Sequence, residues 1–178
     1  MDIKLFQLNM HKSKACMAGF SNWTSDKEEA FIYCVQEPCV HKSNVIGVPK
    51  GLSVNHHASN NRTRAAVISS RGLNAWSMPE FTNEDISTVL FKGILAESDD
   101  DKEDLIVCSV YLDITDSKVI PDQLEKLVQM AKRYHKKLVV CLDTNAHSIL
   151  LGKDTNSRGE KLEEFIFCYD LKIENRGQ

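Results

Sequence analysis

The sequence predicts a layered α/β or α+β domain, because strand-like apolar runs alternate along it with amphipathic helical segments. Its 178 residues are the usual length of one domain and are enough to bury a substantial core. Hydrophobic residues make up 42% and charged residues 26%, a balance that argues against a disordered chain. We therefore expect residues 1–178 to form a single domain.

No membrane-spanning or secretory segment is expected. No uninterrupted apolar stretch approaches the roughly 20 residues that a membrane span requires. Near the start, Lys4, His11, Lys12 and Lys14 interrupt any apolar run, so a secretory signal is not predicted either. The chain is expected to be soluble and intracellular.

The first part of the chain predicts two strands and one helix. Residues 3–10 are a candidate strand, and residues 13–24 are a candidate helix that Gly19 weakens. Residues 30–36 form a nearly continuous apolar run, typical of a strand buried on both faces, and Pro38 ends it.

The middle of the chain predicts four more strands, separated by polar or glycine-containing turns. They cover residues 52–57, 64–70, 85–96 and 105–111. Because no helix separates these neighbours, antiparallel pairing is expected among them.

The last part predicts two helices around one buried strand. The first helix should begin with Pro121 at its first position and bury Leu124, Leu127, Val128, Ala131 and Tyr134. Residues 137–142 (KLVVCL) should be a buried strand. The final helix should open with a capping box of Ser157 and Glu160.

The charge balance limits the kinds of partner. Lysine and arginine number 22 against 25 acidic residues, for a net charge of -3. Proteins that coat nucleic acid are usually basic. Any polyanionic substrate must therefore be held locally or through a bound cation.

Polar residues end four of the apolar strands. Asn9, Glu37, Tyr111 and Asp143 stand at these ends, and Asn145 follows two residues after Asp143. Ligand sites in α/β sheets gather at strand ends, and carboxylates beside amide oxygens suit Mg²⁺. Taken singly, each could be a solvated strand end, a turn or a core aromatic. Their recurrence at strand ends favours a functional site.

An ordered set of motifs resembles the endonuclease/exonuclease/phosphatase superfamily, and most of all the apurinic-type endonuclease domain encoded by non-LTR retrotransposons. The motifs are residues 7–9 (QLN), 36–38 (QEP), 109–111 (SVY), 143–148 (DTNAHS) and 156–159 (NSRG). Residues 162–166 (LEEFI), 170–171 and Asn175 strengthen the resemblance, which spans nearly the whole chain.

The resemblance implies a four-layer α/β/β/α sandwich of the DNase I-like type and phosphodiester hydrolysis with Mg²⁺ or Mn²⁺. By it, Glu37 is the metal ligand, with Asn9 in the same shell. Asp143 aligns or deprotonates the attacking water, while Asn145 and Tyr111 hold the scissile phosphate.

Three further residues, His147, Asn156 and Arg64, are weaker matches, implied to contact the DNA backbone or to brace loops. The implied partners are DNA and the reverse transcriptase domain of the same polyprotein, with no membrane. The nucleus is the expected location, inferred from the DNA substrate.

The sequence departs from the superfamily pattern in two places. An aromatic residue commonly follows the DTNAHS motif, where this chain has residues 149–152 (ILLG). The last two motifs, a Ser-x-x-Asp strand and an Asp-His pair, should follow Asn175 and are not in the sequence. We therefore expect a sandwich without its last strands and an impaired nicking activity.

Other functions stay open at this point. One keeps the superfamily but changes the substrate, to abasic DNA or a phosphoinositide. Another is a degenerate, non-catalytic remnant that acts as a binding module.

Overall fold

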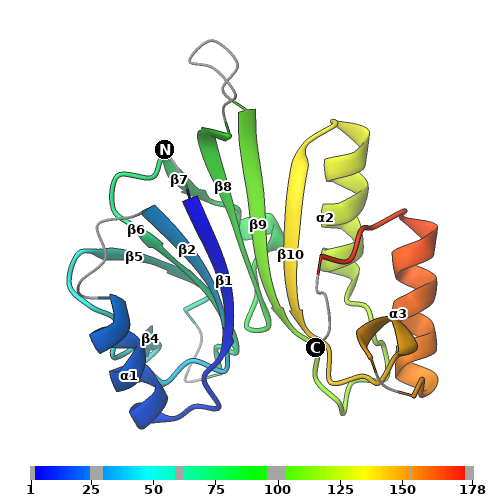
Figure 1. Ribbon diagram of the computed structural model, residues 1–178, viewed down its shortest axis with the longest axis horizontal. Coiled ribbons are helices and arrows are strands. Elements are labelled where there is room, and N and C mark those ends of the chain that lie inside the picture. The colour runs from blue at the N-terminus through cyan, green and yellow to red at the C-terminus, as the bar shows by residue number, and fades with distance from the viewer. Residues whose placement is uncertain (1–2, 25–29, 59–61, 96–102, 153, 175–178) are drawn as a thin grey trace.

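The computed structural model describes residues 3–24, 30–58, 62–95, 103–152 and 154–174. Two four-stranded sheets stack face to face, and helices cover their outer faces (Figure 1). Helix α1 (Lys14–Thr24) covers the first sheet, while α2 (Asp122–Arg133) and α3 (Ser157–Cys168) cover the second. The expected four-layer α/β/β/α sandwich is confirmed.

The first sheet has the strand order β1-β2-β6-β5. Strands β1 and β2 are parallel, and the other neighbours are antiparallel. The bounds are β1 Ile3–Asn9, β2 Ala30–Gln36, β5 Leu52–His56 and β6 Ala65–Ser70, and a short hairpin of β3 (Val40–His41) and β4 (Asn44–Val45) lies between β2 and β5 in the chain. From Phe31 to Gln36, strand β2 is buried on both faces, as its apolar sequence predicted.

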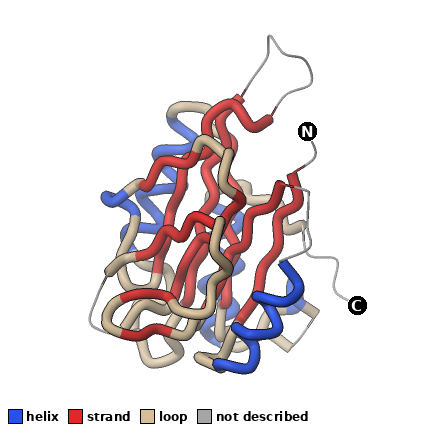
Figure 2. The backbone as a smooth tube through the Cα atoms, turned by 90° about the vertical axis from the view of Figure 1, so that its left-hand side faces the viewer, coloured by secondary structure: helices blue, strands red, loops and turns tan. Residues whose placement is uncertain are grey.

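The second sheet has the order β10-β9-β8-β7, with β9 and β10 parallel and the other pairs antiparallel. Figure 2 looks onto the sandwich from the side of the first sheet. The bounds are β7 Ala75–Ser77, β8 Ile86–Leu95, β9 Glu103–Tyr111 and β10 Lys137–Asp143. Two 3-10 turns, η1 (Pro79–Phe81) and η2 (Ile149–Leu151), follow β7 and β10.

Strand register brings the functional strand ends to one edge. Asn9 lies opposite Gln36 in the first sheet, and Asp143 lies opposite Tyr111 in the second. Parallel neighbours end at the same edge, so the loops that follow β1, β2, β9 and β10 gather there.

Helix α2 forms where its sequence pattern predicted. Its apolar face packs on the second sheet, and acidic residues in its first turn and basic residues in its last turn suit the helix dipole. Pro121 precedes the helix as its cap residue and is not its first helical residue. Tyr134 is also outside the core, with 59% of its surface exposed, because the helix ends before it.

Two other predictions about the last third of the chain are wrong. Strand β10 is an edge strand, and Val139 is 37% exposed because no strand among the described residues pairs with the outer side of β10. The N-cap of α3 is Asn156, whose Oδ1 accepts a hydrogen bond from the Gly159 backbone N–H at 2.9 Å. Ser157 therefore lies inside the helix, and the predicted capping box is displaced by one residue.

The expected antiparallel run in the middle of the chain is only partly right. Strands β5 and β6 pair antiparallel, as do β8 and β9. The chain crosses from the first sheet to the second between β6 and β7, so β6 and β8 face one another across the sandwich.

None of the helices in the described ranges is long and apolar enough to cross a membrane.

Candidate active site

A direct contact joins the two sheets at the shared edge. Asn9 ends β1 and Asp143 ends β10, and the Asn9 Nδ2 donates to Asp143 Oδ2 at 2.5 Å. The other end of the same amide is also held, since Asn9 Oδ1 accepts from the His11 backbone N–H at 2.7 Å. Two residues separated by 134 positions thus share one site with a fixed amide orientation.

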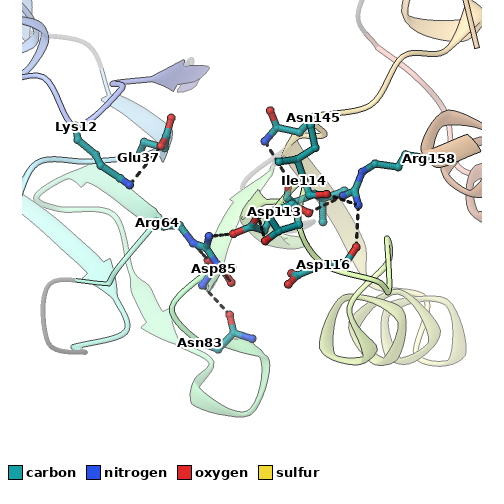
Figure 3. Close-up of polar contacts among 12 residues, drawn as sticks. Lys12, Glu37, Arg64, Asn83, Asp85, Asp113, Ile114, Asp116, Asn145 and Arg158 are labelled. Atoms are coloured by element: carbon teal, nitrogen blue, oxygen red, sulfur yellow. Dashed lines mark hydrogen bonds and ion pairs between the residues drawn. The ribbon is translucent and has the colours of Figure 1, made fainter. Parts of the chain in front are cut away.

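Glu37 lies on the first-sheet side of this site. It follows β2 in the left-handed region, with φ of 49°, a conformation unusual for a non-glycine residue. Its backbone N–H donates to Arg64 O at 2.8 Å, and its carbonyl accepts from Lys12 N at 2.8 Å. Its carboxylate is largely shielded from solvent and lies 3.7 Å from both His11 Nδ1 and Lys12 Nζ. The turn therefore places a partly buried carboxylate beside the Lys12 ammonium (Figure 3).

Tyr111 and Asn145 lie on the second-sheet side. Asn145 Nδ2 donates to Leu112 O at 3.0 Å, which holds the amide on the loop directly after Tyr111. Burial raises the pKa of Tyr111, and the nearby charges of Glu37 and Asp113 raise it further. The phenol is therefore protonated at neutral pH and can donate a hydrogen bond to an anion. Arg64 connects Glu37 to this side, because its carbonyl accepts from the Glu37 backbone N–H and its guanidinium lies 5.0 Å from the centre of the Tyr111 ring.

A buried polar bridge connects the sheets directly beneath these groups. Gln36 is fully buried, and its Nε2 donates to Ser109 Oγ at 3.0 Å and to Cys141 O at 3.3 Å. Ser109 Oγ donates in turn to Val35 O at 3.1 Å. Gln7 Nε2 adds a bond to Leu142 O at 2.8 Å. Buried polar groups are retained where they are satisfied, and these fix the spacing between the two halves of the site.

Arg64 holds a second charged cluster next to Tyr111. Its guanidinium contacts both oxygens of Asp85, with Nη2 to Oδ2 at 2.7 Å, and also pairs with Asp113. It also lies 5.0 Å from the centre of the Tyr111 ring. Burial raises the pKa of Asp85, whereas the Thr115 backbone N–H and hydroxyl and the Arg64 guanidinium lower that of Asp113 to about 2. Arg64 thus ties the loop before β8 to the loop after β9.

Arg158, in the first turn of α3, fixes the loop after β9 from the opposite side. Its Nη1 donates to Asp116 O at 2.9 Å and to Ile114 O at 3.4 Å, and its Nη2 donates to Asp113 O at 2.8 Å. Three backbone carbonyls of residues 113–116 therefore accept hydrogen bonds from one guanidinium.

The loop between β10 and α3 is held by backbone contacts of the NSRG motif. Asn156 Oδ1 accepts from His147 N at 3.3 Å, and Asn156 N donates to His147 O at 3.0 Å. A Cβ atom at Gly159 would lie 1.7 Å from His147 O, so only glycine permits this close approach. Asn156 and Arg64 therefore hold loops in place through their hydrogen bonds. Asn156 holds the backbone of His147, whereas the His147 side chain is exposed.

The structure brings together Asn9, Glu37, Tyr111, Asp143 and Asn145 at one edge, with Arg64 beside them. His147 and Asn156 lie in the loop that follows, and Asn175 lies outside the described residues. The sequence analysis missed the supporting residues Asp85, Asp113 and Arg158. Only the NSRG motif pointed to Arg158, while the two aspartates had no signal beyond their positions near strand ends.

The site offers few protein oxygen atoms to a hard divalent ion. Among the described residues, no group of three or more His, Cys, Asp or Glu side chains is gathered around a point. Glu37 offers a carboxylate, and Asn9 Oδ1 offers an amide oxygen that accepts one hydrogen bond already. Mg²⁺ commonly keeps several waters and binds through one or two carboxylates, so these residues fit such an ion.

A groove lies beside Glu37. Lys12, Arg62, Thr63, Arg64 and Glu84 line it. A second hollow, lined by His147, Ile149, Gly152 and Asp154, lies in the loop after β10. Lys12 pairs with Glu37, and Arg64 pairs with Asp85 and Asp113, so carboxylates offset much of the positive charge of the groove.

Comparisons with known proteins concern the family and the fold of the chain. Residues 105–178 match the model of a family described as endonuclease-reverse transcriptase. That match contains Tyr111, Asp143 and Asn145, while Asn9 and Glu37 lie before it. Among curated proteins, none matches this chain.

A solved structure shares the fold over nearly the whole chain. It is the endonuclease domain of TRAS1, a telomere-specific non-LTR retrotransposon. The TM-score is 0.74 at 24% sequence identity, and the match covers 96% of this chain and 72% of that one. With the ordered motifs of the sequence, the partial family match and the shared fold confirm the resemblance to the endonuclease/exonuclease/phosphatase superfamily and, within it, to the endonuclease domains of non-LTR retrotransposons.

Proposed function

We propose that this chain nicks DNA for a non-LTR retrotransposon by hydrolysing one phosphodiester bond with a divalent metal. The contact between Asn9 and Asp143 carries the proposal, because it unites the two halves of the site at the edge where the loops converge. The family match and the fold shared with the TRAS1 endonuclease domain support nuclease chemistry and a DNA substrate.

Asp143 is proposed to position and deprotonate the attacking water. Its Oδ2 accepts from Asn9, which fixes the carboxylate and leaves Oδ1 to take the proton. The Asn9 amide is itself fixed by the His11 backbone, so the carboxylate cannot rotate freely. Asp143 then acts as the general base.

Tyr111 and Asn145 are proposed to hold the scissile phosphate. Burial raises the pKa of Tyr111, so its hydroxyl stays a donor over the neutral and alkaline range. Donors fixed before the reaction stabilise negative charge as it develops on the phosphate oxygens.

Glu37 and Asn9 Oδ1 are the residues that would hold Mg²⁺ or Mn²⁺. When bound, the ion supplies positive charge that stabilises the transition state and the leaving oxygen. The Lys12 ammonium, 3.7 Å from the Glu37 carboxylate, offsets part of its charge, and His11 Nδ1 lies at the same distance.

The test is relaxation of a supercoiled plasmid by the chain with Mg²⁺. We expect nicking that EDTA stops and that Asp143→Asn and Glu37→Gln abolish. Asp170→Asn, an exposed carboxylate after α3, is the matched control and should nick as the unmodified chain does. Relaxation that persists in EDTA or in either of the two variants contradicts the proposed roles.

DNA binding measured in parallel separates an enzyme from a non-catalytic module. If the chain shows neither metal-dependent nicking nor metal-dependent DNA binding, the proposed function is refuted. Binding that ignores both substitutions and the metal favours the remnant that acts only as a binding module.

A substrate series separates the related activities. Intact duplex, a duplex with one abasic site and a phosphoinositide are offered in the same buffer. Comparable cleavage of the two duplexes supports the retrotransposon function, whereas cleavage confined to abasic DNA indicates a repair enzyme.

The biological setting follows from the same proposal. A nick that leaves a 3′-hydroxyl would let the reverse transcriptase domain of the same polyprotein prime on chromosomal DNA. That role places the domain in the nucleus.

A further inference from the structure

The loop after β9 presents a large apolar side chain at the edge of the site. Ile114 is 65% exposed and lies two residues after Leu112, whose carbonyl accepts the Asn145 amide. Figure 3 draws Ile114 among Asn145, Asp113 and Arg158. Its side chain is therefore next to the proposed phosphate-binding residues.

The backbone beneath Ile114 is tied down from two sides. Arg158 donates to the carbonyls of Asp113, Ile114 and Asp116. On the other side, Asp113 pairs with Arg64 and accepts from Thr115 N at 2.8 Å and Thr115 Oγ1 at 2.7 Å. A loose loop could fold an exposed isoleucine back onto the protein, but this loop holds it outward.

The charges of this loop disfavour a phosphate contact. Asp113 is ionised, Asp116 is exposed, and residues 113–117 contain no lysine or arginine. Lys118, the next cation, pairs with Asp122 and Glu125. The groove that Lys12, Arg62, Thr63, Arg64 and Glu84 line lies on the first-sheet side of Tyr111, away from this loop. What the loop offers to DNA is therefore the apolar side chain of Ile114.

We propose that Ile114 is an apolar wedge that enters the minor groove of duplex DNA beside the nicked phosphate and unstacks one base step. The proposal rests on the proposed nicking function. Isoleucine is among the side chains that proteins insert between base steps, and unstacking kinks the duplex. A kink at this point would turn the phosphate backbone toward Tyr111, Asn145 and Asp143.

Unwinding of a plasmid tests the wedge without knowledge of the target sequence. The chain is bound to relaxed plasmid with Ca²⁺ in place of Mg²⁺, and a metal-independent type I topoisomerase then fixes the linking number. We expect a change in linking number with the unmodified chain. Ile114→Thr, of similar shape but polar, should remove most of that change and weaken duplex binding about tenfold. Ile114→Leu should preserve both.

The control is Phe167→Ala, which removes an equally exposed apolar side chain near the far end of α3. It should unwind DNA as the unmodified chain does, and thermal melting checks that each variant is folded. Unwinding by Ile114→Thr equal to that of the unmodified chain overturns the wedge, and so does an equal loss in both variants.

The outcome distinguishes the wedge from the function on which it rests. If the unmodified chain nicks DNA and Asp143→Asn does not, the nicking function stands even when Ile114→Thr unwinds normally. If the unmodified chain neither binds nor nicks DNA, the function and the wedge fail together.

Discussion

The space between the two sheets has two chemically different regions. Its centre is apolar and almost fully buried, formed by Ile32, Cys34, Val67, Val89, Phe91, Val107 and Cys141. Toward the site edge, Gln7, Gln36 and Ser109 form a hydrogen-bonded bridge. Apolar packing stabilises without strong direction, whereas hydrogen bonds fix distances and angles. The centre therefore holds the sheets together, and the polar bridge sets how their functional ends meet.

The largest expected effect is that of Asp143→Asn at the site edge itself. The new amide oxygen can still accept from Asn9, so the fold and the contact between the sheets should persist. Loss of the proposed general base should lower nicking about a thousandfold. Nicking rates and thermal melting measured together check this, and a variant that retains half the activity contradicts the role of Asp143.

The next effect contrasts Gln36→Leu with Val107→Ala. Both side chains are fully buried between the sheets. Each change should lower the free energy of unfolding by about 2 kcal/mol, one by removing hydrogen bonds and the other by leaving a cavity. At a temperature where both variants are folded, only Gln36→Leu should lower the nicking rate. Urea unfolding and nicking assays give the two quantities, and equal nicking by both would show that the bridge does not position the site.

A smaller and more closely matched contrast uses two buried serines. Ser109 Oγ donates to Val35 O at 3.1 Å, and Ser87 Oγ donates to Asn55 O at 2.8 Å, in each case across to the first sheet. Substituting either by alanine should cost about 1 kcal/mol of unfolding free energy. We expect only Ser109→Ala to slow nicking, by a few-fold, because only Ser109 also accepts from Gln36. A similar slowing by Ser87→Ala would point to general destabilisation.

The smallest effect concerns pH and the loop beneath Ile114. The Thr115 backbone N–H and hydroxyl and the Arg64 guanidinium lower the pKa of Asp113 to about 2. The folded-state pKa lies below the unfolded one, so the contribution of Asp113 to stability is present above about pH 4. It is lost as the pH falls through about 2. Urea unfolding between pH 2 and 7 should therefore show a shallower acid decline for Asp113→Asn, and an unchanged decline would contradict the assignment.

The sequence was informative where one local signal dominated. The apolar run of β2 predicted both its bounds and its burial, and the spacing of Leu124, Leu127, Val128 and Ala131 predicted the buried face of α2. The strand-end positions of Asn9, Glu37, Tyr111 and Asp143 also pointed to one edge. That inference needed only the alternation of strands and loops, because the ends of parallel strands meet.

The sequence was misleading where a neighbour decided the outcome. The apolar sequence KLVVCL suits a central strand, but β10 lies at the edge of its sheet, so Val139 is exposed. Ser157 and Glu160 matched a capping pattern, but Asn156 caps α3 because its side chain also holds the backbone of His147. Both outcomes depend on contacts with distant or folded segments.

By itself, the sequence determined the residue types, their order and their places at strand ends, because these follow from local periodicity and motif spacing. Only the tertiary structure decided that Asn9 contacts Asp143 and that one arginine from each side holds residues 113–116. It also decided that Gln36 bridges two sheets. Such contacts join positions from about 40 to more than 130 residues apart, and a chain acquires them only when burial of the apolar core brings the two sheets together.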